Sequence, residues 1–589
     1  MKQTKTRLSA LITILLITSI GFGQTSAKVE PVRKPETATK ASPAKPVTPE
    51  VIESELKEAL ALVENNYVAG KSINYNDVMK ASIDSMLHTL DPHSNYFDAK
   101  EFEQFMTDQS SKYFGIGATI GDLSDENGNV QATYIKATFE GAPAYKAGLR
   151  YGDKLVAFTG QKVGAEGKIN EVKNESLLGK PFPEVRSYLR GPEGTTIQLT
   201  VEHLNGQREN VSITRGSVPQ PSISEVYMIR PGIGYMAMRG GFNQTTYGEF
   251  IKGLRDLKAA GMQQLILDLR DNGGGLVIQA YRVANTFLNN GQMVFTQKGR
   301  IEGVNEIYPA ENTTHDRSPI VMLVNRNTAS ASEILSGAMQ DHDRALIVGE
   351  NTFGKGLVQN PFRLDYGSML LLTIAKYETP SGRLIQRDYS NGDLYNYYTE
   401  GGSFHDDTAD PAKPTGAQSK TDTGRPVYSG GGINPDVYIK PQTITIERNR
   451  NQQKLANPTF AFALQMVNGQ VKGFESYKVD KPIVFDYDIK STDFPVTEAL
   501  YQSFKKFSAD KFKTTSAQVD AEREFVERTL RTDLVTAAYG SQTSFQVFNE
   551  YDNQLLKAID LLPQARQLAM ASEKLHTTTA TKQPGRDNK

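Results

Sequence analysis

A serine, a lysine and a glutamine near the middle of the chain have the types and spacing for acyl-transfer chemistry. Ser330 stands between a short apolar run at residues 320–324 and a helical pattern, so it falls at or beside a helix N-terminus. Free backbone N–H groups and the positive end of the helix dipole meet there, and both favour an anion that forms on a bound carbonyl. A serine in this place therefore has an oxyanion site beside it.

The serine also needs a base, because its hydroxyl is a poor nucleophile at its ordinary pKa. His342 lies twelve positions along the same predicted helix, roughly 18 Å away at about 1.5 Å per residue, which is too far. Lys355 follows the next apolar run, at residues 345–348, and stands between two glycines among apolar neighbours. Such a lysine can be desolvated enough to lose its proton. We therefore predict Lys355 as the base, with Gln359 holding its neutral amine.

Each of these residues also has a structural interpretation. Ser332 is an equally good helix cap, and spacing alone does not prefer Ser330 over it. Residues 349–356, G-E-N-T-F-G-K-G, nearly match the phosphate-cradling pattern G-x-x-x-x-G-K-[ST]. Gly356 stands where the magnesium-binding hydroxyl should be, which argues against a nucleotide site.

The whole segment resembles the active-site region of the carboxyl-terminal processing proteases, also called tail-specific proteases, which use a Ser-Lys dyad. In that family the nucleophile is the first serine of S-A-S, and the lysine lies 25 positions later in T-F-G-K-G-x-V-Q. Ser330 and Lys355 have this spacing. The resemblance implies that Gln359 orients the lysine and that Asp341 is a supporting polar position.

The same resemblance implies where the oxyanion hole lies. It is built from the backbone N–H of the residue after the serine and one N–H of a glycine turn. Here these are Ala331 and one glycine of D-N-G-G-G-L at residues 271–276, for which we expect Gly274. Three glycines also suit a close turn between a strand and a helix.

A second motif, F-G-I-G, begins a stretch of short strand-like runs and turns. A glycine-bounded turn can aim several backbone N–H groups at one carboxylate, and an open strand edge can pair with an extended peptide. Together with A-G-L-R-Y-G-D-K-L at residues 147–155, the motif resembles the PDZ domain inserted in this protease family. Without that block, F-G-I-G reads equally well as a tight turn. The predicted carboxylate-binding residues are Phe114, Gly115, Ile116 and Gly117.

Composition excludes several classes of protein. With 66 basic and 67 acidic residues the formal net charge is −1, so nothing suggests a nucleic-acid surface. The chain has no cysteine, which excludes disulfides, thiolate zinc, a cysteine nucleophile and a lipoprotein anchor. The seven histidines show no metal-ligand spacing. We therefore expect neither a metal nor another cofactor.

The N-terminus has the pattern of a secretory signal peptide. Basic residues precede an apolar run at residues 8–22, and small residues follow near Gly23 and Ala27. An uncleaved membrane anchor is the alternative, but the run is shorter than the ~20 residues that a span needs. We expect an exported, periplasmic protein that meets a membrane only through the location of its substrates.

These observations predict a multidomain α/β protein with a β-rich PDZ domain, a layered α/β protease core and helical segments at both ends. L-D-P-H-S-N-Y-F at residues 90–97 also resembles a family element, and we assign its His93 a packing role. The predicted organisation is a signal peptide at 1–27, a flexible linker at 28–50, a helical N-terminal segment at 51–112, a PDZ domain at 113–218, a serine protease core at 219–445 with an inserted surface loop at 388–426, a C-terminal helical region at 446–576 and a disordered tail at 577–589.

The sequence thus predicts an exported serine endopeptidase that binds a substrate's free C-terminal tail and cleaves the protein near that end. The expected partners are proteins or peptides with free C-terminal tails. A catalytically silent scaffold or chaperone that only holds such tails is the alternative hypothesis. Intact Ser330, Lys355 and Gln359 argue against it, because binding alone does not require this trio. The natural substrate and the oligomeric state are left open.

Overall fold

The computed structural model describes residues 47–69, 73–109, 112–163, 169–390, 394–399 and 416–580. The predicted signal peptide and residues 28–46 of the predicted linker lie outside these ranges. The chain divides into two units, residues 1–75 and 76–589. The helix of the first unit is α1 (Pro49–Asn66), where Thr48 accepts a hydrogen bond from the N–H of Val51 and a proline stands in the first turn. No residue of α1 is buried.

A six-stranded sheet organises the second unit. Its order is β10-β11-β12-β15-β16-β21, and all neighbours from β11 onward are parallel. Parallel neighbours need a long crossover between them, and here α6, α7 and α8 lie in these connections. The elements are β10 (Glu225–Arg230), β11 (Ile233–Ala237), α6 (Thr246–Ala259), β12 (Gln264–Asp268), α7 (Val277–Asn285), β15 (Ile320–Val324), α8 (Ala331–Asp341), β16 (Ala345–Gly349) and β21 (Val437–Tyr438).

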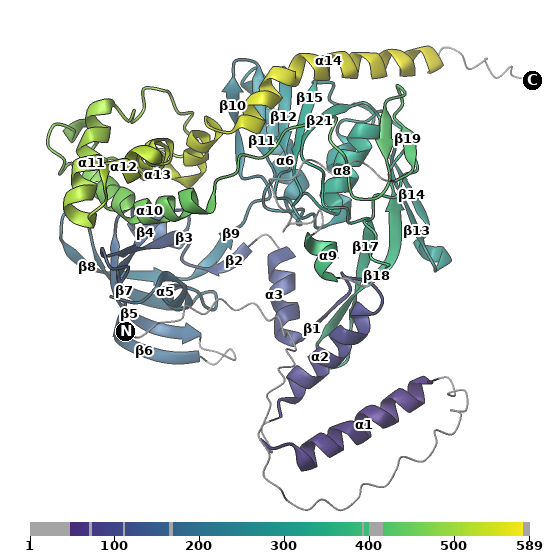
Figure 1. Ribbon diagram of the computed structural model, residues 1–589, viewed down its shortest axis with the longest axis horizontal. Helices are drawn as coiled ribbons and strands as arrows, with labels where there is room; N and C mark the ends of the chain where they lie inside the picture. The colour runs from purple at the N-terminus through teal and green to yellow at the C-terminus, as the bar shows by residue number, and fades with distance from the viewer. Residues whose placement is uncertain are drawn as a thin grey trace, which may run out of the picture. The chain divides into compact units, whose positions relative to one another are not determined.

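Helices cover both faces of this sheet. Apolar side chains of α6, α7 and α8 pack on one face, where Phe250, Ala280 and Leu335 are fully buried. The other face is covered by α14 (Asn553–Ala580), which also runs along the sheet in Figure 1. Burial on both faces explains why the strands at 320–324 and 345–349 read as unbroken apolar runs.

An antiparallel sheet lies beside the crossover helices. Its order is β1-β18-β13-β14, and β17 also pairs with β18. The pairing of β1 with β18 brings the L-D-P-H-S segment against the strand that follows the predicted lysine loop. The elements are α2 (Tyr75–His88), β1 (Asn95–Phe97), α3 (Ala99–Gln109), β13 (Met293–Gly299), β14 (Glu306–Pro309), β17 (Leu357–Arg363) and β18 (Met369–Glu378).

A β-rich domain occupies the region predicted as a PDZ domain. Its main sheet has the order β3-β4-β5-β7-β8, with β6 also paired to β5, around a core that includes Leu155, Phe158 and Leu199. Within the described part of the domain β3 pairs with β4 alone, so β3 is an edge strand. The elements are β2 (Lys112–Gly115), β3 (Ala118–Ser124), β4 (Val130–Thr138), α4 (Pro143–Lys146), β5 (Lys154–Val163), β6 (Ile169–Ser176), α5 (Phe182–Leu189), β7 (Thr196–Glu202), β8 (Arg208–Thr214) and β9 (Gly216–Pro219), with β2 paired to β9.

The C-terminal part of the chain is helical, as predicted for this region. It comprises α10 (Ile446–Val467), α11 (Glu498–Phe512), α12 (Ser516–Ala521), α13 (Arg523–Asn549) and α14. The first four share a core with Tyr151 of the β-rich domain. Because α14 runs to Ala580, residues 577–580, which we expected in a disordered tail, are helical. Residues 581–589 lie outside the described residues.

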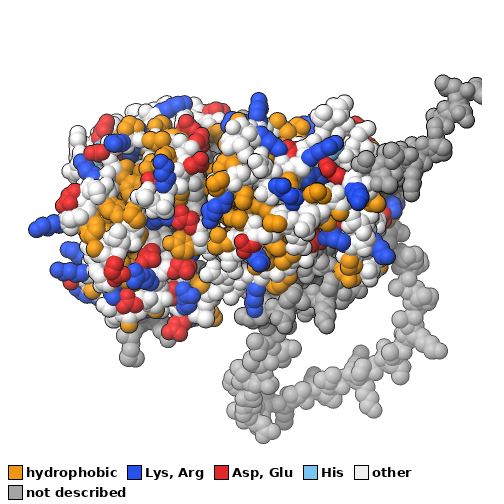
Figure 2. Space-filling model, turned by 90° about the horizontal axis from the view of Figure 1, so that it is seen from above, with side chains coloured by type: hydrophobic (Ala, Val, Ile, Leu, Met, Phe, Trp, Pro, Cys, Tyr) orange, Lys and Arg blue, Asp and Glu red, His pale blue; other side chains and the backbone are white. Residues whose placement is uncertain are grey.

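Both signs of charge are interspersed on the face of the molecule that Figure 2 shows. On the face that Figure 2 shows, Lys and Arg side chains alternate with Asp and Glu, in keeping with the net charge of −1. Among the described helices, none is long and apolar enough to cross a membrane.

Candidate active site

Three loops that contain the predicted catalytic residues begin at the same edge of the central sheet. The glycine turn follows β12, Ser330 follows β15, and Lys355 follows β16, and these three strands are consecutive neighbours. Since the strands are parallel, their carboxyl ends lie at the same edge, which is where ligands bind in open α/β sheets. The topology alone therefore brings the three motifs together.

Ser330 immediately precedes α8 and has an unusual backbone conformation. Its φ of 57° and ψ of −118° are sparsely populated by residues other than glycine, at a cost of order 1–3 kcal/mol. Its side chain is half-buried, whereas Ser332 is fully buried and donates its hydroxyl proton to the carbonyl oxygen of Asn272 at 2.9 Å. The two serines, which the sequence alone left equivalent, are thus separated, and Ser330 is the accessible one.

The carboxylate of Glu333 ties the serine to the lysine loop. Its Oε2 accepts the backbone N–H groups of Ser330 and Lys355, each at 2.8 Å, so these two nitrogens lie within twice that distance of each other. Its Oε1 accepts the Thr352 hydroxyl at 2.5 Å and the N–H of Gly354 at 2.7 Å. Burial raises the pKa of Glu333, and these four donors oppose that shift because they favour the carboxylate.

A tyrosine hydroxyl forms a second tie between the same two residues. Tyr377, on β18, donates to the carbonyl oxygen of Ser330 and to that of Lys355, at 3.1 Å each. Its ring is buried in the core that also holds the sheet and its crossover helices. Ser330 and Lys355 are therefore joined through their N–H groups on one side and their carbonyl groups on the other. Neither Glu333 nor Tyr377 was predicted to have this function.

The side chain of Lys355 is hydrogen-bonded to an uncharged side chain. Its Nζ donates to Oε1 of Gln359 at 2.7 Å, and the amide Nε2 of Gln359 donates to the carbonyl oxygen of His93 at 2.6 Å. Burial lowers the pKa of Lys355, although the charges of Asp91 and Glu333 act in the opposite direction. A lysine with a lowered pKa and an amide partner is suited to accept a proton.

The L-D-P-H-S segment lies beside the lysine. Beyond its carbonyl contact with Gln359, His93 places Nε2 2.7 Å from the hydroxyl of Tyr397, which is 3% exposed on α9 (Leu394–Thr399). Burial and the charge of Lys355 lower the pKa of His93 to about 3, so its ring is neutral. The sequence predicts only a packing role for His93 and a surface loop at residues 388–426. The structure instead places His93 against Gln359, the partner of Lys355, and Tyr397 against His93, and the only sequence signal for this was the family resemblance of residues 90–94.

The predicted oxyanion donors both lie against Ser330. A Cβ added to Gly274, whose φ is 96°, would lie 2.8 Å from the Cβ of Ser330 and 2.9 Å from the nitrogen of Ala331. Only glycine allows this approach. Within the part of the chain that the structure describes, the N–H of Ala331 has no acceptor. The N–H of Gly274 donates to Oδ1 of Asn272 at 2.9 Å.

Asp341 and His342 lie at the opposite end of α8. Asp341 is 1% exposed and accepts hydrogen bonds from the N–H and the hydroxyl of Ser381, besides forming an ion pair with the buried guanidinium of Arg383. His342 follows it and places Nδ1 2.8 Å from Asp422. The structure therefore brings together Ser330, Lys355 and Gln359, and it does not bring Asp341 into contact with them.

The loop that resembles a phosphate cradle already surrounds an anion. The Thr352 hydroxyl and the N–H groups of Gly354 and Lys355 all point at the carboxylate of Glu333. These are the donors that a phosphate would need. Among the described residues, no group of three or more His, Asp or Glu side chains is arranged to hold a metal ion.

The predicted carboxylate-binding residues lie at the start of the β-rich domain. Phe114 and Gly115 belong to β2, and Ile116 and Gly117 follow it and line a cavity of about 790 Å³. Gly117 has a φ of 72°, and a Cβ there would overlap the Cβ of Ala142. Two of the four predicted residues thus border an open cavity, at a turn that requires glycine.

Comparison with known proteins supports the resemblance. Residues 232–394 match the model of peptidase family S41. The chain is 31% identical over 314 residues to a carboxy-terminal-processing protease of Bartonella bacilliformis, covering 52% of this chain and 67% of that one. It is 32% identical over 331 residues to a carboxyl-terminal-processing protease of Synechocystis sp., covering 55% and 72%. With a probable CtpA-like serine protease of Staphylococcus haemolyticus it shares 32% identity over 333 residues, which is 56% of this chain and only 62% of that protein's length.

Solved structures also match. The photosystem II D1 C-terminal processing protease matches 66% of this chain and 87% of its own, at 24% identity and a TM-score of 0.32. The PDZ domain of a carboxy-terminal protease from Vibrio cholerae in complex with peptide matches 18% and 97%, at 21% identity and a TM-score of 0.14.

Proposed function

The chain belongs to the carboxy-terminal-processing protease family, and we propose that it is a serine endopeptidase with Ser330 as nucleophile and Lys355 as base. One observation carries this proposal: Glu333 and Tyr377 join the backbones of Ser330 and Lys355 from two sides. A merely structural serine and a solvated lysine would need no such arrangement. The Lys355 amine, which is buried and hydrogen-bonded to the Gln359 amide, then acts as the base.

Proton transfers in the proposed reaction balance within this pair. Nζ of Lys355 uses one N–H on Gln359, so its lone pair remains for the hydroxyl proton of Ser330 as Oγ attacks the scissile carbonyl. The resulting ammonium gives this proton to the leaving amine as the peptide bond breaks. A water molecule then attacks the acyl ester while the neutral amine accepts its proton, and Ser330 recovers a hydrogen when the ester breaks.

The oxyanion that develops during the attack needs hydrogen-bond donors close to Ser330. The N–H of Ala331 stands at the first turn of α8, where the helix dipole adds to its effect. We propose it as the first donor. As the second we propose Gly274, whose N–H would have to leave Oδ1 of Asn272 when substrate binds. A nearby glycine of the same turn is the alternative.

The β-rich domain is proposed to be the PDZ module that captures the substrate's C-terminal end. Its edge strand β3 and helix α5 both line the cavity that Ile116 and Gly117 border. The charged side chains of that lining are Arg186, Arg190, Arg239 and Glu140. Arg239 is paired with Glu225 and Asp268, so the positive charge that suits a carboxylate comes from Arg186 and Arg190. An extended tail could add to the free edge of β3 with its terminus at the glycine turn.

A cleavage assay with a matched variant tests the proposed function. An unfolded protein with a free C-terminus should be cut by the wild type and left intact by Ser330→Ala. The same substrate with an amidated C-terminus should be cut more slowly because it lacks the carboxylate. Since Ser330 and Lys355 supply both nucleophile and base, we expect a chelator to leave the rate unchanged. If wild type and variant are equally inactive but bind the tail equally well, the scaffold hypothesis replaces the protease.

Export is part of the same proposal and rests on the pattern of residues 2–27. Fractionation of cells that express the full chain should recover it outside the cytoplasm, shortened by N-terminal cleavage near Gly23 or Ala27. Recovery of the uncut chain in the cytoplasm would contradict export and leave the catalytic proposal standing.

A further inference from the structure

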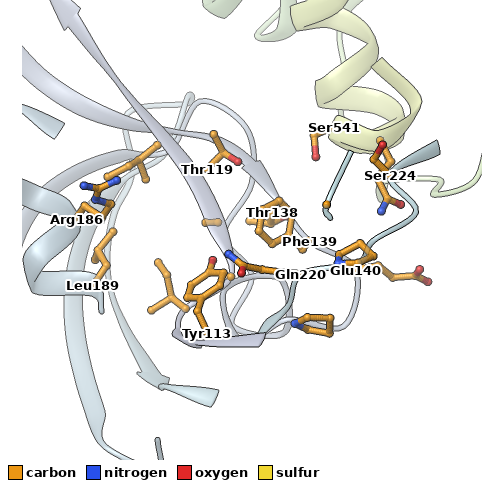
Figure 3. A pocket seen from close by; sticks show the side chains of 18 of the residues that line it. Tyr113, Thr119, Thr138, Phe139, Glu140, Arg186, Leu189, Gln220, Ser224 and Ser541 are labelled. Atoms are coloured by element: carbon orange, nitrogen blue, oxygen red, sulfur yellow. The ribbon is translucent and has the colours of Figure 1, made fainter. Parts of the chain in front are cut away.

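The cavity beside the β-rich domain is built from three parts of the chain. One side comes from that domain, the opposite side comes from the C-terminal helical region, and residues 221–240 of the core contribute the rest. In Figure 3, Arg186 and Leu189 lie on one side, Ser541 and Ser224 on the other, and Thr138 and Phe139 between them. The residues contributed by the C-terminal region are Phe485, Ser541, Gln542 and Phe545, which we call the helical wall.

A kink in α13 presents these side chains to the cavity. Gly540 has a φ of 85° and a ψ of 166°, which interrupts the helix just before Ser541. A Cβ at Gly540 would lie 3.0 Å from the ring of Phe485, so glycine also permits this ring to pack there. Ser541, Gln542 and Phe545 then lie on one face of the restarted helix, at spacings of one and four residues. Phe545 and Gln542 are exposed and so are available to a ligand.

The helical wall is fixed to the β-rich domain. The two parts share a core in which Tyr151 packs with the C-terminal helices, and the ring of Phe485 lies 5.2 Å from that of Tyr145. Nζ of Lys136 pairs with Asp533 of α13 at 3.8 Å. These contacts hold the wall at a set distance from the glycine turn, so both can contact one ligand.

A series of close contacts connects the cavity lining to Ser330. Gly240 lines it, and the next residue, Gly241, lies so close to the glycine turn that an added Cβ would be 3.1 Å from the carbonyl oxygen of Gly274. The N–H of Phe242 donates to that same oxygen at 2.7 Å. Gly274 in turn touches Ser330. We therefore expect a polypeptide whose end is held in the cavity and whose cut bond lies at Ser330 to pass along this side.

We propose that the helical wall selects the substrate segment that lies between the captured C-terminus and the cut bond, and that it prefers apolar side chains there. The inference rests on the proposed function and adds the substrate class. Phe485 and Phe545, together with Phe139 across the cavity, offer aromatic surface, and burial of apolar side chains against them supplies the preference.

Peptide binding to the full chain with Ser330→Ala tests this preference without cleavage. Two fluorescein-labelled peptides share the same last four residues and carry either Leu-Phe-Leu or Ser-Gly-Ser immediately upstream. Adding Phe545→Ala should weaken the Leu-Phe-Leu peptide by about fivefold and leave the Ser-Gly-Ser peptide unchanged. Phe362→Ala is the control, because Phe362 is also an exposed phenylalanine and is not part of the cavity lining.

A second variant keeps the inference testable if Phe545→Ala fails to fold. Gln542→Glu changes an exposed side chain of the wall and should favour a peptide with an upstream Lys-Ser-Lys block over one with Asp-Ser-Asp, by about threefold at low salt. Equal binding ratios in all variants would overturn the inference. So would equal weakening of both peptides by Phe545→Ala, since that result would report an indirect effect through Arg239, whose guanidinium lies 5.7 Å from the ring.

The two proposals fail separately. If cleavage depends on Ser330 but the binding ratios do not respond to Phe545 or Gln542, only the role of the helical wall is lost. If the binding ratios respond as expected but cleavage does not depend on Ser330, the wall selects tails for another purpose and the protease assignment falls.

Discussion

Both ends of α8 carry a polar residue, but the hydrogen bonding of the two residues differs. At its start, Ser330 is half-buried with a positive φ, and within the described chain the N–H of Ala331 has no acceptor. At its end, Asp341 is almost fully buried and all its capacity is used by Ser381 and Arg383. The start of α8 thus keeps backbone strain and an unused hydrogen-bond donor, whereas the carboxylate at its end already has its hydrogen-bonding partners.

This difference shows how to tell a reactive polar group from a structural one. A buried polar group that only stabilises the fold has its partners in place, because an unmet donor or acceptor is costly. A group that acts on a substrate must keep capacity for atoms that arrive later. This criterion agrees with the proposal that the start of α8 is the reactive end, so substitutions there should reduce turnover more than substitutions at Asp341.

The largest effect is expected for Ser330→Ala, which removes the proposed nucleophile. Turnover should fall by at least about a thousandfold, to the rate that binding and the oxyanion donors alone sustain. Ser336→Ala is the control on the same helix, since its hydroxyl donates to the carbonyl oxygen of Ser332 one turn earlier. Its kcat, measured on the same unfolded substrate, should stay within about threefold of wild type. Similar losses in the two variants would mean that α8 has been disturbed as a whole.

The next effect concerns the protonation state of Lys355. Because burial lowers its pKa and only the neutral amine accepts a proton, kcat/KM should rise with pH through that pKa and reach its plateau below the pH at which an ordinary lysine titrates. Lys355→Met should lose the rise and nearly all activity. Lys355→Arg should not restore it, because the guanidinium stays protonated. A flat pH profile in the wild type would contradict lysine as the base.

Much of this site could be predicted from the sequence, because its motifs are local and follow predictable strands. Ser330, Lys355 and the turn that contains Gly274 each come directly after an apolar run, and the parallel sheet places the ends of such runs together. The Lys355 contact with Gln359 spans four residues and was foreseeable for the same reason. For these residues, the positions of the motifs after apolar runs in the sequence already indicate where the residues lie in the sheet.

The rest depends on pairings across long stretches of chain. His93 reaches Gln359 because β1 pairs with β18, and Tyr397 comes from a region that looked like a polar surface loop. Glu333 looked like an ordinary first-turn acid, since nothing local shows that its carboxylate also serves Gly354 and Lys355. The sequence pattern of a helix end does not reveal which distant donors will meet it.

A smaller loss is expected for Glu333→Gln, which breaks the shared anchor of the serine and the lysine. A glutamine has one acceptor oxygen where the carboxylate has two, so one pair of N–H or O–H donors would face an amide NH₂. Misplacement of the dyad should reduce kcat by roughly tenfold to a hundredfold.

The same variant has a signature that a general loss of structure would not give. The negative charge of Glu333 raises the pKa of Lys355, so its removal should lower that pKa further and move the rising limb of kcat/KM to lower pH. Measuring the profile beside that of the wild type checks this. A limb that stays in place, with the rate reduced, would mean that Glu333 acts on the lysine only through position.

The smallest effect on turnover is expected where the resemblance implied a supporting role, at Asp341. Asp341→Ala leaves the buried guanidinium of Arg383 without its carboxylate, which should cost about 3–5 kcal/mol of unfolding free energy. The fraction that stays folded should nevertheless keep kcat within about threefold of wild type, because the dyad lies at the other end of the helix. Thermal unfolding and active-site titration of the same sample separate the two quantities. If kcat falls as it does in Glu333→Gln while the unfolding temperature is unchanged, Asp341 supports the chemistry directly, and spare capacity no longer distinguishes the two ends of α8.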